Sequence, residues 1–217
     1  MSLIDTHTHL YDEAFDADRD AVLARAAECG VERLLLPAID SASHGRLFAL
    51  TDAYPGVCLP MMGLHPASVN ENPDFRNELA LVESLLKNSA RKFYAIGETG
   101  LDLYWSKDFL REQTEALRFQ IELALRHDLP IVLHTRDAFS EMIAVVNDYR
   151  GTGLRGIFHS FAGTCEQYLE LKDIGKFAFG IGGVVTYKNA TIAKVANQMN
   201  LADIVLETDA PYLPPVP

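Results

Sequence analysis

Four histidines and two carboxylates stand at the ends of short apolar runs in this 217-residue sequence. The six residues are His7, His9, Glu98, His134, His159 and Asp209. Imidazole nitrogen and carboxylate oxygen together form a ligand set that suits zinc, manganese, iron or magnesium. Two such ions, about 3.5–4 Å apart, need a shared carboxylate against their mutual repulsion and can activate a water molecule as a nucleophile. The set therefore predicts a binuclear hydrolytic centre, with Glu98 as the bridge.

The segment Ile4-Asp5-Thr6-His7-Thr8-His9 brings two of these imidazoles together. Side chains alternate along an extended strand, so His7 and His9 point to the same face, with Asp5 behind them. An isolated His-x-His pair is a weak motif, and two solvated histidines at a polar strand end explain it about equally well. We interpret the pair as metal ligands only because the other four residues accompany it.

Each of those residues also has a purely structural explanation. A single histidine at a strand end is more often only hydrogen-bonded, and an aspartate there as often caps the next helix. Six such coincidences in one chain are improbable. His44 and His127 are left out of the set, because they fall near the start of one expected helix and in the last turn of another.

A pattern of apolar run, polar residue and amphipathic helix repeats along the chain and predicts β/α alternation. The expected strands cover 4–9, 33–39, 57–64, 93–97, 131–133, 156–158, 177–181 and 204–208. The expected helices lie between Phe15 and Gly30, from Ser41 or Ser43 to a point before Pro55, and at 74–86 and 107–126, with two more after the fifth and sixth strands. Eight near-continuous apolar strands are typical of an α/β fold of the (β/α)8 TIM-barrel type. The rival, an open doubly wound sheet, does not explain why so many strands end in polar residues, whereas the carboxyl ends of barrel strands meet at one rim.

Composition and charge limit the classes of protein to which this chain can belong. A hydrophobic fraction of 48% is ample for a sizeable core, and we expect a single domain over residues 1–217. No apolar run approaches the roughly 20 residues of a membrane span, and no signal peptide precedes the first strand. The three cysteines are widely spaced, which is typical of reduced thiols. We therefore expect a cytoplasmic protein. The formal net charge of −11 argues against a broad basic surface, so any phosphate recognition must be local.

Several motifs, in this order along the chain, resemble the TatD family of metal-dependent deoxyribonucleases within the amidohydrolase-like barrels. They are Asp5-Thr6-His7-Thr8-His9-Leu10, Gly63-Leu64-His65-Pro66, Gly97-Glu98-Thr99-Gly100-Leu101-Asp102, His134-Thr135-Arg136-Asp137-Ala138, His159-Ser160-Phe161 and Glu207-Thr208-Asp209-Ala210-Pro211-Tyr212. The resemblance covers essentially the whole chain. It implies hydrolysis of phosphodiester bonds in DNA, on single strands and from an end. It also implies two divalent metal ions (Mg, Mn or Zn), one held by His7, His9, Glu98 and Asp209 and the other by Glu98, His134 and His159.

Asp209 is the candidate general base, since a carboxylate beside a metal ion stays charged and can accept the proton of the attacking water. His65 and Arg136 are candidates to bind the phosphate, because a guanidinium can hold two phosphate oxygens at once. The alternative for Arg136 is a salt bridge with Asp137 or another acid.

Other residues carry weaker expectations. Lys188 follows the glycine pair at 182–183, where barrels often build phosphate sites, but a surface lysine needs no explanation. Tyr104 and Trp105 lie just past Glu98, where an exposed ring could stack a nucleobase and a buried one would pack in the core. Glu207 shares a strand face with Asp209, one layer deeper, and we expect it to be hydrogen-bonded.

Two other functions remain open at this point. A centre of this kind attacks the carbonyl carbon of an amide or ester as readily as phosphorus, and a barrel can keep a metal site without catalysis. The family continues past the Pro-Tyr-Leu segment into closing helices, whereas this sequence stops at Pro217. We therefore expect either a longer natural chain or a last strand without its covering helix.

Overall fold

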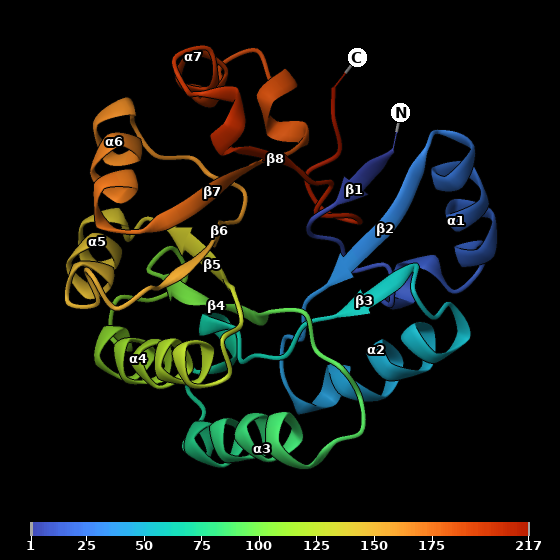
Figure 1. The fold of residues 1–217 in the computed structure, drawn as a ribbon, viewed down its shortest axis with the longest axis horizontal. Coiled ribbons are helices and arrows are strands. Elements are labelled where there is room, and N and C mark those ends of the chain that lie inside the picture. The colour runs from blue at the N-terminus through green and yellow to red at the C-terminus, as the bar shows by residue number, and fades with distance from the viewer. Residues whose placement is uncertain (1, 217) are drawn as a thin grey trace.

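The computed structural model describes residues 2–216, over which strands and helices alternate (Figure 1). The strands are β1 (Leu3–Asp5), β2 (Val31–Leu36), β3 (Cys58–Pro60), β4 (Ile96–Asp102), β5 (Ile131–Arg136), β6 (Arg155–Phe158), β7 (Lys176–Ile181) and β8 (Ile204–Leu206). The α-helices are α1 (Arg19–Glu28), α2 (Ser41–Ala53), α3 (Phe75–Asn88), α4 (Leu110–Arg126), α5 (Phe139–Asn147), α6 (Cys165–Ile174) and α7 (Ile192–Ala196). Short 3-10 helices lie at η1 (Glu13–Phe15), η2 (Pro66–Ser68), η3 (Gly183–Thr186) and η4 (Leu201–Asp203).

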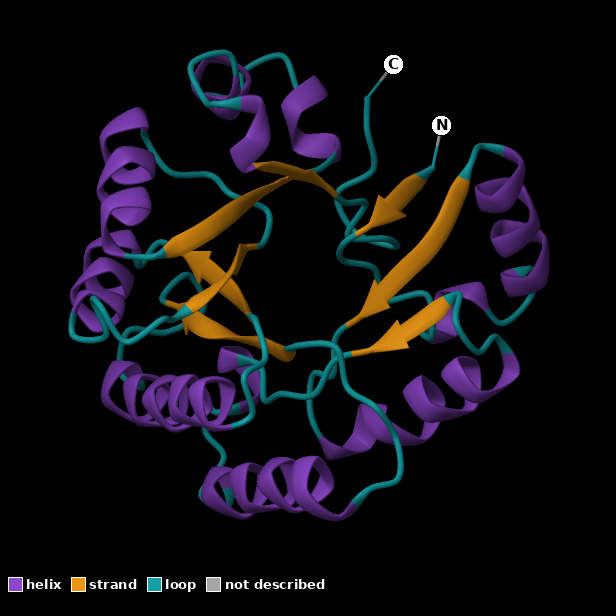
Figure 2. Cartoon of the chain, viewed as in Figure 1, coloured by secondary structure: helices purple, strands orange, loops and turns teal. Residues whose placement is uncertain are grey.

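The strands form a closed barrel, which confirms the predicted fold class (Figure 2). All strand pairs are parallel, in the orders β1-β2-β3 and β4-β5-β6-β7-β8. The two groups join where Met62 bonds to both neighbours of Ile96, from its N–H to the carbonyl of Ala95 (3.1 Å) and from its carbonyl to the N–H of Gly97 (2.9 Å). The barrel closes where the Thr6 N–H donates to the carbonyl of Leu206 (3.1 Å). Parallel order and closure bring all eight carboxyl ends to one rim.

The helices surround the barrel and cover its outer face (Figure 1). In α4 the apolar residues recur at helical spacing, and Leu117 and Ile121 are fully buried. Burial of each such side chain contributes about 1.5–3 kcal/mol to folding. Two buried glutamines of the same helix, Gln113 and Gln120, bond to β4 and to the loop after β3, and so fix the position of the strand that carries Glu98.

Several strands are shorter than predicted or shifted. β1 ends at Asp5, so His7 and His9 lie after the strand. There the Thr8 N–H donates to Leu35 of β2 and the His9 N–H to Ala210 beyond β8. β4 begins at Ile96 and runs to Asp102, so Glu98 lies inside the strand and not after it. The apolar run 93–97 did not reveal this, because the polar half of β4 is itself fully buried.

The outer face of the barrel at β8 and β1 differs from the rest. Among the described residues no helix follows β8, and segment 207–216 runs over the rim instead. Ile4 and Leu206, on the neighbouring strands, are correspondingly exposed. Within residues 2–216 no helix is both long and apolar enough to cross a membrane.

Candidate metal centre

The six residues singled out from the sequence meet at the carboxyl-terminal rim. His7 and His9 follow β1, Glu98 lies in β4 and His134 in β5. His159 directly follows β6, and Asp209 lies three residues beyond the end of β8. His7, His9, Glu98 and His159 are buried. The four histidines and two carboxylates therefore converge from five strands, as the strand-end pattern predicted.

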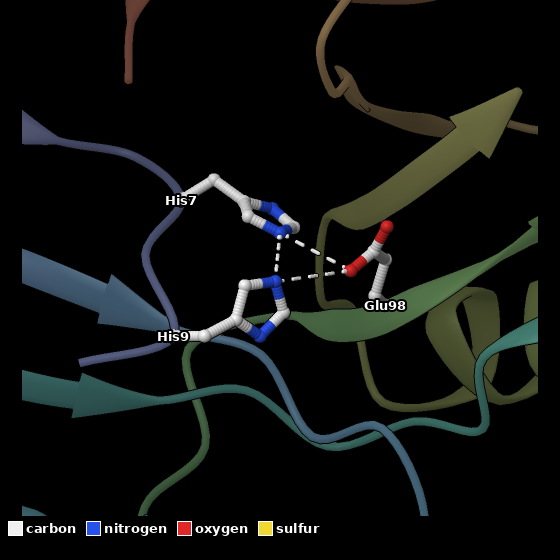
Figure 3. Close-up of side chains that lie close together, drawn as sticks. All are labelled: His7, His9 and Glu98. Atoms are coloured by element: carbon white, nitrogen blue, oxygen red, sulfur yellow. Dashed lines mark hydrogen bonds and ion pairs between the residues drawn. The ribbon is translucent and has the colours of Figure 1, made fainter. Parts of the chain in front are cut away.

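One group of donor atoms lies around His7 and His9 (Figure 3). The Nε2 atoms of the two rings are 3.2 Å apart, and Glu98 Oε2 lies 3.1 Å from the first and 3.7 Å from the second. Asp209 Oδ1 lies 3.8 Å and 3.4 Å from the same two nitrogens. Four ligands at about 2.1 Å from a central ion, in tetrahedral arrangement, are about 3.4 Å from one another. The spacing of these atoms therefore fits a single divalent ion.

The other oxygen of Glu98 faces a second group of nitrogens. His134 Nδ1 lies 3.0 Å and His159 Nε2 3.9 Å from Glu98 Oε1. His159 is also 3.5 Å from Asp209 Oδ1, and its ring stacks on His7 with the ring centres 3.4 Å apart. In this structure His159 therefore gathers most tightly with His7 and Asp209, while His134 gathers with Glu98 and His65. Glu98 alone presents one oxygen to each side, which is the arrangement that a bridging carboxylate needs.

Hydrogen bonds on the far side of the His9 ring decide which of its nitrogens can bind a metal. The hydroxyl of Tyr11 donates to the carbonyl of Pro37 (2.7 Å) and lies 3.1 Å from His9 Nδ1. Since the hydroxyl proton is already used, the Tyr11 oxygen accepts from Nδ1–H. The lone pair of neutral His9 is then on Nε2, which points into the cluster.

Asp102 acts on His134 in the same way. Its Oδ2 lies 2.9 Å from His134 Nε2 and accepts the proton there, so the neutral ring has its lone pair on Nδ1, the atom 3.0 Å from Glu98 Oε1. Burial lowers the pKa of His134, but Asp102 and Glu98 outweigh it and raise the value, so a metal ion on Nδ1 would take the place of a proton. The other oxygen, Oδ1, accepts from the N–H of Tyr104, which fixes the carboxylate. Neither Asp102 nor Tyr11 was expected from the sequence to take part in the site. The signal for Asp102 was its place four residues after Glu98, on the same face of β4.

Glu207 supports His159, and its expected hydrogen-bonded position is confirmed. Glu207 Oε1 lies 3.1 Å from His159 Nδ1 and accepts from the N–H of Ser160 at 2.6 Å. The carboxylate lies against Gly180 of β7, where a Cβ atom on residue 180 would overlap Glu207 Oε2. Only glycine at position 180 leaves room for this carboxylate.

The pKa values of the cluster follow from burial and mutual charge. Burial, with the charge of His159 beside it, lowers the pKa of His7 to about 4, so this ring is neutral and free to coordinate. Burial would also lower the pKa of His159, but Glu207, Glu98 and Asp209 outweigh it and raise the value to about 10. Burial favours protonation of Glu98, yet the surrounding imidazoles hold its pKa well below the usual range. A metal ion that binds here would therefore compete with the proton of His159.

The donor set fits a cation. Two imidazole nitrogens that carry lone pairs cannot lie 3.2 Å apart, beside two ionised carboxylates, without a proton or a metal ion between them. No cysteine takes part, which excludes a thiolate site within this cluster. The buried histidine and carboxylate clusters are thus suited to a binuclear centre of zinc, manganese or magnesium.

His65 is better suited to a substrate than to a metal. Its Nδ1 accepts from the N–H of Ala67, so the proton of the neutral ring sits on Nε2, 3.5 Å from Glu98 Oε1. Burial lowers the pKa of His65 against the opposing charge of Glu98, which favours this neutral form. The ring therefore offers a donor to the cluster and no lone pair.

The cluster opens into a cavity of about 880 Å³. Its lining includes His65, Arg136 and Trp105, together with the apolar residues Phe161, Val184 and Val185. Lys188, the third expected substrate contact, does not belong to this lining and is exposed beyond η3. Its role in substrate binding stays a prediction.

Comparisons with known proteins agree with this geometry. The family model TatD related DNase matches residues 4–217. The metal-dependent hydrolase YjjV of Escherichia coli, described as uncharacterized, is 32% identical over 212 residues, which cover 97% of this chain and 80% of the relative. The similarly described YabD of Bacillus subtilis is 33% identical, over 99% of this chain and 82% of that protein. The crystal structure of YjjV superposes with a TM-score of 0.88 over 99% of this chain and 81% of its own. This chain therefore belongs to the TatD-related DNase family of metal-dependent hydrolases.

Proposed function

We propose that this protein is a metal-dependent phosphodiesterase that hydrolyses DNA, on single strands and from an end. The observation that carries the proposal is the set of donors beside the cluster. His65 Nε2–H and the Arg136 guanidinium line the same cavity as Glu98 and Asp209, and both suit a phosphate. The scissile group of a cyclic amide or ester is uncharged, whereas a phosphodiester carries its negative charge at the reacting group itself, where these two donors would lie.

His7, His9, Glu98 and Asp209 would hold one ion, and Glu98, His134 and His159 the other. When bound, divalent ions polarise the phosphate and activate water. Asp209 lies at the cavity side of the cluster with its side chain 13% exposed, where its second oxygen can accept the proton of the attacking water. His65 would donate to a phosphate oxygen, and Arg136 would orient the strand. Asp102, Glu207 and Tyr11 hold the imidazoles and do not touch the substrate.

The test uses protein stripped with a chelator and reloaded with Mg²⁺, Mn²⁺ or Zn²⁺ singly. We expect hydrolysis of single-stranded DNA and of bis-p-nitrophenyl phosphate, with little or none of dihydroorotate. Hydrolysis of dihydroorotate alone would identify an amide hydrolase. No turnover of any substrate with any metal, in protein shown to contain two ions, would identify a non-catalytic metal-binding protein.

The variant Glu98→Gln tests the bridge in the same assay. A neutral amide cannot offset the repulsion between two cations, so we expect metal content to fall at both sites and activity to be lost. The control is Glu122→Gln, on exposed helix surface away from the cavity. Wild-type metal content in Glu98→Gln would contradict the bridging role.

A further inference from the structure

Trp105 is the only tryptophan of the chain, and its side chain lies open at the cavity. It belongs to the loop between β4 and α4, and 69% of its surface is exposed. Its neighbour Tyr104 is 54% exposed. The two rings meet edge to face, with centres 5.0 Å apart and planes at 86°. These exposures exclude the core-packing role that the sequence left open, and they leave an aromatic face available to a ligand.

Arg136 lies directly against this aromatic pair. Its guanidinium carbon is 3.6 Å from the centre of the Tyr104 ring and 5.7 Å from that of Trp105. Among residues 2–216 it has no ion pair, neither with Asp137 nor with any other acid, whereas arginines such as Arg76 and Arg91 each bind a carboxylate through two nitrogens. A stacked guanidinium keeps the N–H groups at its edge free. Arg136 is thus held in place by an aromatic ring and is available to an anion.

The aromatic pair and the guanidinium are connected to the metal cluster through short stretches of chain. Arg136 follows His134 by two residues on β5, and Trp105 follows Asp102 by three after β4. Asp102 itself fixes both His134 and the N–H of Tyr104. Arg136 and Trp105 also line the same cavity as Glu98 and Asp209, so an anion on Arg136 and a planar group on Trp105 would share that cavity with a group bound at the cluster.

We propose that Trp105 stacks on an unpaired nucleobase while Arg136, supported by Tyr104, binds the adjacent phosphate, so that this side of the cavity selects single-stranded nucleic acid over other phosphodiesters. The inference rests on the proposed function for the identity of the substrate. Every base has a π face, so stacking tolerates any sequence but requires that the base is not paired within a duplex. A local contact of this kind also suits a chain of net charge −11, which cannot rely on a basic surface.

Intrinsic fluorescence tests the stacking without measuring catalysis, because Trp105 is the sole tryptophan. The probe is decathymidylate with phosphorothioate linkages, titrated with and without Mg²⁺. Its partner has the same length and charge but carries tetrahydrofuran abasic residues in place of every thymidine. Base stacking is worth about 1–3 kcal/mol, or about 5- to 150-fold in affinity. We expect the first probe to quench the fluorescence and the abasic probe to bind weaker by that factor. Equal affinity without quenching, or binding of neither probe under either condition, would overturn the proposal.

Steady-state kinetics supply the second arm. Trp105→Ala should raise KM for single-stranded DNA by about 5- to 150-fold with kcat unchanged, since the ring contacts a base and not the reacting atoms. Trp105→Phe should recover most of the loss, and the abasic strand should give the same KM with either residue. The matched control is Tyr94→Ala, which removes a ring that also carries a cation, Lys92 at 4.7 Å, but lies before β4 at the opposite end of the barrel. An unchanged KM in Trp105→Ala would refute the stacking. If wild-type protein cleaves no DNA while the quenching persists, the proposed function fails and the stacking site stands.

Discussion

Replacing Asp102 by asparagine changes one contact of the centre while leaving its shape intact. In the wild type Oδ1 accepts from the N–H of Tyr104, and Oδ2 accepts from His134 Nε2–H. Because the Tyr104 amide needs an acceptor, the asparagine oxygen takes that side and its NH2 group faces His134. The ring must then accept at Nε2 and carry its proton on Nδ1, the atom that points at Glu98.

This change of tautomer sets the size of the effect. Removal of a group that orients a metal-binding histidine costs about 10- to 100-fold in metal affinity, equivalent to about 1.4–2.7 kcal/mol. Only the side of the centre that contains His134 should weaken. His7 and His9, whose rings are held elsewhere, should bind as before.

Calorimetric titration of the metal-free protein, combined with metal analysis after dialysis, measures both sites. We expect one site of Asp102→Asn to keep its affinity and the other to lose about 10- to 100-fold. The control is Asp108→Asn, an exposed aspartate of the same connection between β4 and α4. Two sites of wild-type affinity in Asp102→Asn would refute the assignment of Nδ1 as the ligand atom of His134.

Three more predictions concern base, stability and salt. Asp209→Asn should keep most of its metal while kcat falls by about 10² to 10⁴, the usual contribution of a positioned base; near-wild-type turnover at full metal content would mean that Asp209 is not the base. Burial raises the pKa of Asp5 from 3.8 to about 6, although the hydrogen bonds that its carboxylate accepts from Thr208 and His7 lower it. The free energy that protonated Asp5 contributes to folding is therefore fully present below about pH 4 and is lost as the pH rises through 6. In chelator, the free energy of unfolding of Asp5→Asn relative to wild type should therefore increase by about 2.4 kcal/mol between pH 4 and 7, as measured by urea denaturation, and a pH-independent difference would contradict this. The affinity for DNA should fall only slightly with salt, because the slope of log K against log salt concentration is about −0.7 for each phosphate contacted. A slope steeper than two or three phosphate contacts would give would indicate a basic surface outside the cavity.

The strand-end pattern was sufficient to predict the barrel and the six residues at its rim. Parallel β/α alternation leaves few topologies, and each puts the carboxyl ends of the strands on one side. The ends of strands were less predictable. Glu98 lies inside β4 because Gln113 and Gln120 of α4 satisfy the buried polar half of that strand, and this support comes from residues distant in sequence.

Residue types and their order along the chain determined the ligand chemistry, because imidazole and carboxylate groups at successive strand ends are together best explained as metal ligands. The tertiary structure alone decided which nitrogen of His9, His134 and His159 faces the cluster. Asp102 and Glu207 act from other strands, and the Tyr11 hydroxyl beside His9 is directed by the carbonyl of Pro37. It likewise decided that Arg136 stacks on Tyr104 instead of pairing with Asp137. Spacing along a strand determines the face on which a side chain lies, but a proton or a guanidinium is placed by its nearest partners in space, and those depend on how neighbouring strands and loops pack.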